Sequence, residues 1–393
     1  MPVGAIDAYI WGYPLVLFDA AMRRDVRGHD ASLTGVSLPN DDLAERIEWI
    51  DLQRGPSALV LVETTRYHCV SLFDAWGRNF ASLGTRTTGN ERQTYAIVPP
   101  LWNGAAPHGM QTIQSPTDRV AALGQTTKAG DDSAQPQFSI VPIGPRPNPR
   151  ASNRDADFPR ARESIAAGIA SAGSRPFLAC LQKLLHESER YAKAVGWRDV
   201  VDAALRKDPR ELDDDFTAAI DLIESGSPLT PPVDGWQARR AFDARGSAYL
   251  ERARACRFHF LTGDEQDVFH RFARSDDSGR ALHGRLPYRL HFDVWNEPPA
   301  RAFWSLSACD GRFGALLQSK SNSTVRSRDG LVRNADDSLD ISIQSAPPDE
   351  PNVNWLAVPQ EPFGLILRLY WPRPPALNGL WSPPALRAAS VAA

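Results

Sequence analysis

The chain has 393 residues, of which 42% are hydrophobic and 23% charged, and its 44 basic and 47 acidic side chains give a net charge of -3. This composition excludes a disordered, collagen-like or coiled-coil protein, and the length is enough for more than one hydrophobic core. The charge balance lacks the broad positive field that nucleic-acid binding requires, so we expect no nucleic-acid partner.

The N-terminal region predicts neither an export signal nor a membrane span. Its most apolar stretch, Ala8 to Ala21, is interrupted by Gly12, Pro14 and Asp19, and no basic region precedes it. No later stretch reaches eighteen uncharged apolar residues. From the absence of a signal peptide we expect a cytoplasmic protein.

Short motifs predict no cofactor. The sequence has no G-x-G-x-x-G, no G-x-x-x-x-G-K-[ST], no H-E-x-x-H and no G-x-S-x-G. The four cysteines are scattered and form no C-x-x-C pair, which favours free thiols over disulfides or a zinc site.

Residues 1–150 are predicted to form a β-rich module that ends in the polar, proline-containing segment Pro145 to Asp155. Turn-forming residues bound its short apolar runs, which are Ala58 to Val62, Tyr67 to Phe73, Thr94 to Val98 and Phe138 to Ile143.

Residues 151–255 are predicted to form a helical linker region. Apolar residues recur at three- and four-residue intervals between Ile165 and Leu185. The acidic triplet Asp213 to Asp215 predicts an N-cap and first turn, because carboxylates there accept free amide protons and complement the helix dipole. Trp236 to Ala255 is a further predicted helix.

Residues 256–393 are predicted to form a second β module. In Phe363 to Tyr370 the odd-numbered residues are all apolar, whereas the even-numbered ones include Arg368 and Tyr370. Tyr288 to Phe292 and Leu339 to Gln344 alternate in the same way, which is typical of half-buried strands with one polar face. The predicted fold class is therefore mainly β with a helical middle segment, and its two modules are antiparallel β-sandwiches.

Tryptophan is the most informative residue type in the second β module. Eleven tryptophans occur in the chain, and five lie in the last hundred residues: Trp295, Trp304, Trp355, Trp371 and Trp381. An indole joins a large apolar face to one donor, so it suits the rim of a cleft that binds sugars or other flat ligands. Packing between two sheets is the alternative for each of them.

Several runs resemble a bacterial family that carries paired domains of unknown function, numbered 1254 (N-terminal) and 1214 (C-terminal). The C-terminal runs are Arg301 to Leu306, Asp336 to Leu339, Asn354 to Ala357, Phe363 to Tyr370 and Gly379 to Pro384. The N-terminal runs are Ile10 to Leu15, Asp51-Leu52, Gly84 to Gly89 and Ser115 to Thr117. The resemblance implies two jelly-roll-like sandwich modules joined by helices, and an exported, periplasmic or secreted protein as the alternative to a cytoplasmic one.

This chain departs from the family pattern at two places. Where the family has N-R-D-T-L-Y, the chain has Asn40 to Glu45, and Gln125 replaces an arginine. If those residues line a site, we expect the ligand or the activity to differ from that of other members.

The candidate site residues are polar and aromatic side chains of the two modules. The predicted ligand-binding residues are Arg86, Arg289, His291, Trp304, Trp355, Arg368 and Tyr370. Asp337 and Asp340 are the acid–base candidates, because burial and neighbouring charges can shift carboxylate pKa values into a useful range. A purely structural ion pair with an arginine is the alternative for either aspartate.

The leading hypothesis is a protein that binds a small molecule or glycan in an aromatic-lined cleft. If the protein is also an enzyme, we expect it to hydrolyse a glycoside or ester with the paired carboxylates. The alternative is a structural protein whose β-sandwiches assemble into a homo-oligomer without catalysis. No metal is assigned; a metal-dependent reading requires His68, His259, His283 or His291 to converge with a carboxylate.

Overall fold

In the computed structural model, the described residues are 4–24, 40–105, 109–128, 136, 138–144, 165–187, 196–227, 229–239, 249–311 and 322–389. The chain divides into two compact units. Unit 1 comprises Met1–Ser37, Ala44–Pro228 and Ala241–Thr262, and unit 2 comprises Leu38–Leu43, Leu229–Arg240 and Gly263–Ala393. The predicted fold class, mainly β with a helical middle segment, is confirmed.

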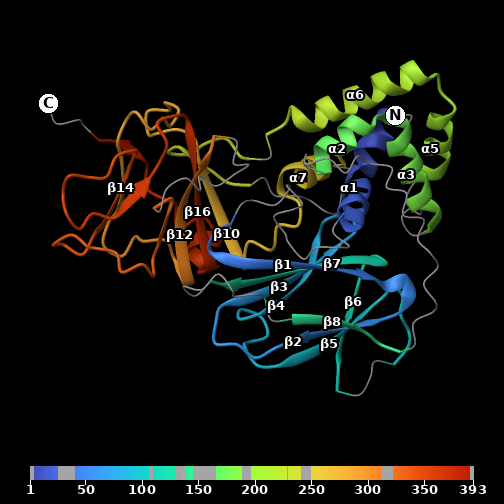
Figure 1. Ribbon diagram of the computed structural model, residues 1–393, viewed down its shortest axis with the longest axis horizontal. Helices are drawn as coiled ribbons and strands as arrows, with labels where there is room; N and C mark the ends of the chain where they lie inside the picture. Colours follow the sequence, from blue (N-terminus) through green and yellow to red (C-terminus); the bar gives the residue numbers. More distant parts are fainter. Residues whose placement is uncertain are drawn as a thin grey trace. The chain divides into compact units, whose positions relative to one another are not determined.

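Unit 1 contains two four-stranded sheets, which are visible in Figure 1. The first sheet has the order β1 (Leu43–Asp51), β7 (Arg119–Thr127), β3 (His68–Asp74) and β4 (Asn79–Gly84), and the short 3-10 turn η2 (Leu52–Arg54) follows β1. The second sheet has the order β6 (Gln111–Gln114), β5 (Gln93–Val98), β2 (Ser57–Leu61) and β8 (Phe138–Pro142). Both sheets supply side chains to one apolar core, as in a sandwich.

The helices of unit 1 cover the other face of its first sheet (Figure 1). They are α1 (Ala5–Arg24), α2 (Ile165–Ala172), α3 (Ser174–Glu187), α5 (Trp197–Leu205), α6 (Pro209–Glu224) and α7 (Tyr249–His259). Side chains alternate along the strands: Leu72 and Ala122 face the core between the sheets, whereas Phe73 and Ala121 face the helices. Because α1 is buried on nearly all sides, its apolar sequence reflects this packing.

Some predicted boundaries differ from the observed ones. Helix α6 begins at Pro209, with Asp208 as its N-cap accepting the Arg210 amide at 2.9 Å, so the start predicted at Asp213 is wrong. Trp236 lies in strand β9 rather than in a helix. The predicted module boundary at 150 lies outside the described residues, and the one at 256 falls inside α7.

Unit 2 contains one five-stranded and one four-stranded sheet. The five-stranded sheet has the order β13 (Thr324–Arg326), β12 (Ala300–Asp310), β16 (Phe363–Pro372), β10 (Val268–Ala273) and β9 (Trp236–Gln237). The four-stranded sheet has the order β15 (Trp355–Ala357), β14 (Leu339–Gln344), β11 (Tyr288–Phe292) and β17 (Arg387–Ala388), and helix α8 (Pro374–Leu377) follows β16. Strands β10, β11, β12 and β16 pair with their neighbours in antiparallel fashion. The pair β14–β15 is parallel, as is β5–β6 in unit 1.

The two sheets of unit 2 enclose an apolar core, and β16 shows how the sequence places it. Leu365, Leu367 and Leu369 lie in that core, as the alternation predicts. The opposite face of β16, with Arg368 and Tyr370, is buried as well. The expectation of a half-buried strand is therefore wrong for β16, because both of its faces are covered.

Among the described residues, no helix combines the length and the hydropathy that crossing a bilayer needs.

Candidate functional site

A row of polar residues crosses four strands on the outer face of the five-stranded sheet, the face turned away from the apolar core. The strand registers align Arg326 on β13 with Ser305 on β12, Ser305 with Arg368 on β16, and Arg368 with His270 on β10. We call these four residues the polar row. Ser305 and Arg368 are fully buried and His270 nearly so. Because buried polar groups cost free energy unless they are hydrogen-bonded, their partners decide what this face can do.

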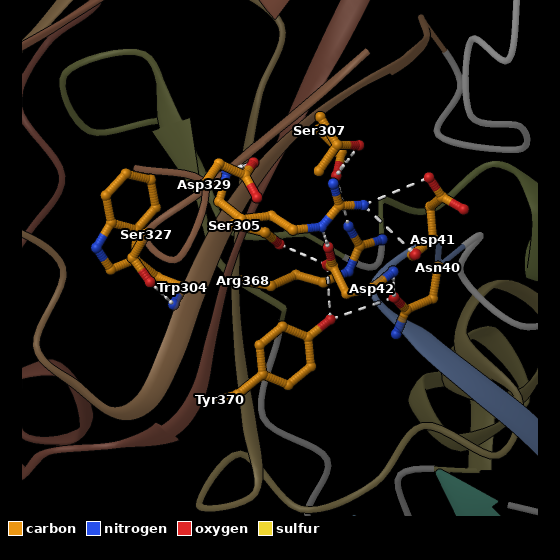
Figure 2. A network of polar contacts seen from close by, with 12 residues as sticks. Asn40, Asp41, Asp42, Trp304, Ser305, Ser307, Ser327, Asp329, Arg368 and Tyr370 are labelled. Carbon is orange, nitrogen blue, oxygen red and sulfur yellow. Dashed lines mark hydrogen bonds and ion pairs between the residues drawn. The ribbon is translucent and has the colours of Figure 1, made fainter. Parts of the chain in front are cut away.

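The carboxylate of Asp42 is the centre of the contacts at one end of the row (Figure 2). Asp42 is fully buried, and its Oδ1 accepts a hydrogen bond from Arg326 Nε at 2.8 Å. Its Oδ2 accepts from Ser305 Oγ at 2.6 Å and from Tyr370 OH at 2.9 Å. One charge-assisted pair and two hydroxyl donors thus compensate the lost hydration of the carboxylate.

The residues before Asp42 are bound to the same sheet. Asn40 Oδ1 accepts from the Asp42 amide at 2.9 Å and from Tyr370 OH at 3.2 Å. Arg326 Nη2 lies 3.4 Å from both the carbonyl oxygen and the carboxylate of Asp41, whose side chain is 56% exposed. The segment Asn40–Asp42 therefore covers one end of the row and leaves Asp41 in contact with solvent.

Hydroxyl groups extend the network along the sheet. Arg368 Nη1 donates to Ser307 Oγ at 3.2 Å, and Thr324 Oγ1 donates to the same oxygen at 3.1 Å. Thr324 and Arg326 belong to β13, the edge strand, and both are only half-buried. Of the four residues of the row, Arg326 on β13 is therefore the least buried.

Tyr370 acts as a neutral donor. Its burial, reinforced by the nearby Asp42 carboxylate, raises the pKa of the phenol well above its ordinary value of 10. Its ring stacks on Phe303 with centroids 4.2 Å apart, and the Arg328 guanidinium lies 4.3 Å from the centre of Phe303. These contacts hold the hydroxyl in place against Asp42.

Of the predicted ligand-binding residues, the structure brings Arg368 and Tyr370 together on this face. Trp304 instead points into the apolar core, where it packs against Phe292. Trp355 lies on the edge strand β15 and donates from Nε1 to the Gln344 carbonyl at 2.9 Å. Arg289 is exposed on β11 of the four-stranded sheet, and Arg86 lies in unit 1, in the turn that follows β4.

His291 and Asp340 form a second polar group, on the four-stranded sheet. They are paired across β11 and β14, with His291 Nδ1 2.8 Å from Asp340 Oδ1. His291 Nε2 lies 3.2 Å from Asp293 Oδ1, and Asp340 Oδ2 accepts from Asn334 Nδ2 at 3.0 Å. The hydrogen bond with Asp340, followed by the charges of both carboxylates, raises the pKa of His291 above 6.5.

Asp337, the other acid–base candidate, lies in the turn before β14. Its side chain is 66% exposed, its backbone has a φ of 69°, and its Oδ1 is 3.6 Å from Arg333 Nε. Among the described residues, Asp337 and Asp340 contact different side chains and share none.

The histidines named for a metal are divided between the units: His68 and His259 belong to unit 1, and His283 and His291 to unit 2. Within the described ranges, no three His, Cys, Asp or Glu side chains form a group that could hold a metal ion.

Reasoning from the sequence missed Asp42, Arg326 and Ser305 as members of the site. The available signal was the segment Asn40 to Glu45, which departs from the pattern of the family that the sequence resembles. Asn40 and Asp42 of that segment accept hydrogen bonds from Tyr370.

Two family patterns match the chain, each described as a protein of unknown function: DUF1254 over residues 20–138 and DUF1214 over residues 268–374. No curated protein matches it. The crystal structure of the VPA0106 protein from Vibrio parahaemolyticus is similar, with a TM-score of 0.69 and 18% identity over 98% of this chain and 99% of that one. An uncharacterized protein from Burkholderia cenocepacia has a TM-score of 0.48 and 13% identity, over 96% of this chain and 86% of the other. The first likeness supports the fold alone.

Replacing Asp42 tests the centre of the network. We expect Asp42→Asn to lower the free energy of unfolding by about 3 kcal/mol, because it leaves Arg326 without its buried carboxylate partner. Asp41→Asn is the matched control, and its effect is expected to stay within about 0.5 kcal/mol because that side chain is largely in water. Urea unfolding followed by circular dichroism measures both. Equal losses in the two variants would contradict the central role of Asp42.

The raised pKa of His291 gives a pH dependence of defined sign. The contribution of protonated His291 to stability is complete below about pH 6.5 and disappears as the pH rises through the raised folded-state value. An NMR titration of the His291 ring should therefore have its midpoint above 6.5. Asp340→Asn is expected to lower that midpoint more than Asp293→Asn, because the hydrogen bond with Asp340 is the largest cause. A larger effect of Asp293→Asn would refute this assignment.

Proposed function

We propose that this chain, which carries the domains of unknown function DUF1254 and DUF1214 in that order, binds a small hydroxylated molecule such as a glycan at the polar row of unit 2. The observation that carries the proposal is the row itself, in which two arginines, a serine and a histidine align across four strands of one covered sheet face. A sheet face covered only for packing is normally apolar.

The chemistry of the row favours hydroxyl groups in the ligand. Arginine only donates hydrogen bonds, whereas the hydroxyls of Ser307 and Thr324 both donate and accept. A sugar hydroxyl can accept from Arg326 and exchange hydrogen bonds with Thr324. These two side chains lie on the edge strand and are half-buried, so the ligand approaches the row from β13.

The contacts of Asp337 and Asp340 favour a binding protein over a hydrolase that uses these two aspartates as its catalytic pair. Paired carboxylates must flank one scissile bond, with the water or the sugar between them. Both oxygens of Asp340 are already bound, by His291 and Asn334, and Asp337 lies exposed in a turn. The two aspartates also lie away from the polar row, before and on β14 of the other sheet.

A thermal-shift screen of monosaccharides, disaccharides, sugar acids and polyols tests the proposal. We expect at least one of them to raise the Tm of the wild-type protein, since a ligand that binds only the folded state stabilises it. The double variant Ser307→Ala/Thr324→Val should weaken binding of that compound about tenfold, because it removes two hydroxyl partners.

Ser342→Ala is the matched control for that experiment. Its hydroxyl also contacts a side chain of its own sheet, Gln344 at 3.1 Å, but lies on β14 outside the polar row. We expect this variant to bind as the wild type does. If it weakened binding as much as the double variant, the polar row would not be the binding site.

A second candidate function is assembly into an oligomer, and it rests on two exposed apolar side chains. Trp295 is 97% exposed and Leu380 is 81% exposed. The turns that carry them adjoin, because Trp381 Nε1 donates to the Asn296 carbonyl at 3.1 Å. Exposed aromatic anchors of this kind are typical of the centres of protein–protein interfaces.

Light scattering of the purified protein separates the two functions. If assembly is the function, the wild type has the mass of an oligomer, and Trp295→Ser/Leu380→Ser shifts it towards the monomer because the interface loses its apolar anchors. Leu101→Ser, at another exposed apolar residue, is the control and should leave the mass unchanged. A monomeric wild type at all accessible concentrations would exclude this role for the Trp295 surface.

A further inference from the structure

Five side chains of unit 1 form a closed ring of contacts, which we call the Arg252 cluster. The ring of Trp76, in the turn between β3 and β4, meets that of Trp11 of α1 edge-on, with their centroids 5.1 Å apart. Trp11 stacks on Trp197 of α5 with a centroid distance of 4.5 Å. Trp197 meets Tyr249 of α7 edge-on at 5.8 Å. Arg252 closes the ring, because its Cζ lies 4.4 Å from the centre of Trp76 and 5.4 Å from that of Tyr249.

Three donor groups of this cluster are buried without a hydrogen-bond partner among the described residues. They are Nε and Nη2 of Arg252 and Nε1 of Trp197, whose side chain is almost completely buried. A buried donor without an acceptor costs free energy, so native structures rarely retain one. Stacking on the faces of Trp76 and Tyr249 compensates the charge of the guanidinium but leaves these donors unused.

The same edge of the guanidinium is satisfied in other arginines of unit 1. In Arg78, Nε and Nη2 donate to Asp74 Oδ2 at 2.8 and 2.6 Å. In Arg257, one turn further along α7 than Arg252, Nε and Nη2 both donate to Glu224 Oε1 at 3.1 Å. Arg78 and Arg257 thus use Nε and Nη2 to bind a carboxylate. In Arg252 no carboxylate of the described residues accepts from these two atoms.

Asp74, a carboxylate whose charge acts on Arg252, is already engaged. Asp74 is fully buried, its Oδ2 is held by the Arg78 side chain, and its Oδ1 accepts the amides of Trp76 and Arg78. Burial, and to a smaller extent the like charge of Arg78, lowers the pKa of Arg252. An arginine nevertheless keeps its charge in a protein, so the cluster holds one cation that needs an anion.

We propose that the Arg252 cluster binds a small monocarboxylate with an aromatic or other flat apolar body. The two carboxylate oxygens accept hydrogen bonds from Nε and Nη2, a geometry that the planar fork of arginine matches with both atoms at once. The apolar body packs on the indole and phenol rings. A single cation favours a monoanion over a doubly charged phosphate. Trp76, Tyr249 and Arg252 are half-buried, so the cluster reaches the surface of unit 1.

This site is independent of the polar row, because all of its residues belong to unit 1 and all residues of the row belong to unit 2. Variants of one site should therefore leave binding at the other unchanged. The failure of either proposal can be recognised without the other.

Calorimetric titration with benzoate and benzamide tests the proposal on the wild-type protein. Two charge-assisted hydrogen bonds and the ring contacts predict a dissociation constant for benzoate on the order of 1 mM. Benzamide has the same shape but no charge and one acceptor oxygen, so we expect it to bind at least about tenfold more weakly.

Variants on α7 locate the site. Arg252→Lys keeps the positive charge but loses the paired donors, and we expect it to weaken benzoate binding at least about tenfold. Arg257→Lys is the matched control: its arginine uses the same two donors on Glu224, and its loss should leave benzoate binding unchanged.

Three results would overturn the proposal: no saturable binding of benzoate, equal binding of benzoate and benzamide, or equal effects of the two lysine variants. Circular dichroism establishes that each variant is folded. If Arg252→Lys does not fold, the comparison of benzoate with benzamide on the wild type still decides the question, because it needs no variant.

Discussion

The buried carboxylate of Asp42 is the constraint on which the architecture of unit 2 around the polar row depends. A fully buried charge is unstable unless a cation and further donors replace its hydration. Arg326, Ser305 and Tyr370 supply them from β13, β12 and β16, three neighbouring strands of one sheet. The donors come from residues at least 263 positions away from Asp42 in the sequence, so the carboxylate fixes the segment before β1 to the C-terminal sheet.

The fold of unit 2 was predictable where periodicity is local. The alternation of Phe363 to Tyr370 gave both the strand and its core face, since neighbouring side chains of a strand point to opposite sides. It could not reveal that the opposite face is covered. Part of that cover comes from Asn40 and Asp42, which contact Tyr370 from 330 and 328 positions away. No pattern within a single strand reports such a contact.

The candidate site was harder to predict because the residue types involved serve several purposes. Trp304 fills the core, Trp355 hydrogen-bonds at a sheet edge and Trp295 is almost fully exposed, although all three occur in similar polar and apolar surroundings in the sequence. An indole has a large apolar face and one donor, and it suits each of these places. For Asp340 the signal was better. The alternation of the two strands predicts that Asp340 and His291 lie on the polar faces of β14 and β11. That the two strands pair with these residues opposite each other could be known only from the fold.

The arginines show two physical solutions to one problem. Arg326 keeps its charge near a covered sheet face because the chain itself provides the Asp42 carboxylate. Arg252 lies over the rings of Trp76 and Tyr249, a place that a planar, weakly hydrated guanidinium tolerates and that the strongly hydrated ammonium group of lysine does not. Stacking satisfies the faces of the guanidinium but not its edge. An arginine whose Nε and Nη2 donate to a carboxylate of the same chain is therefore a structural element. Arg252, whose Nε and Nη2 lack such a partner among half-buried aromatic side chains, has instead the donors that a bound carboxylate needs.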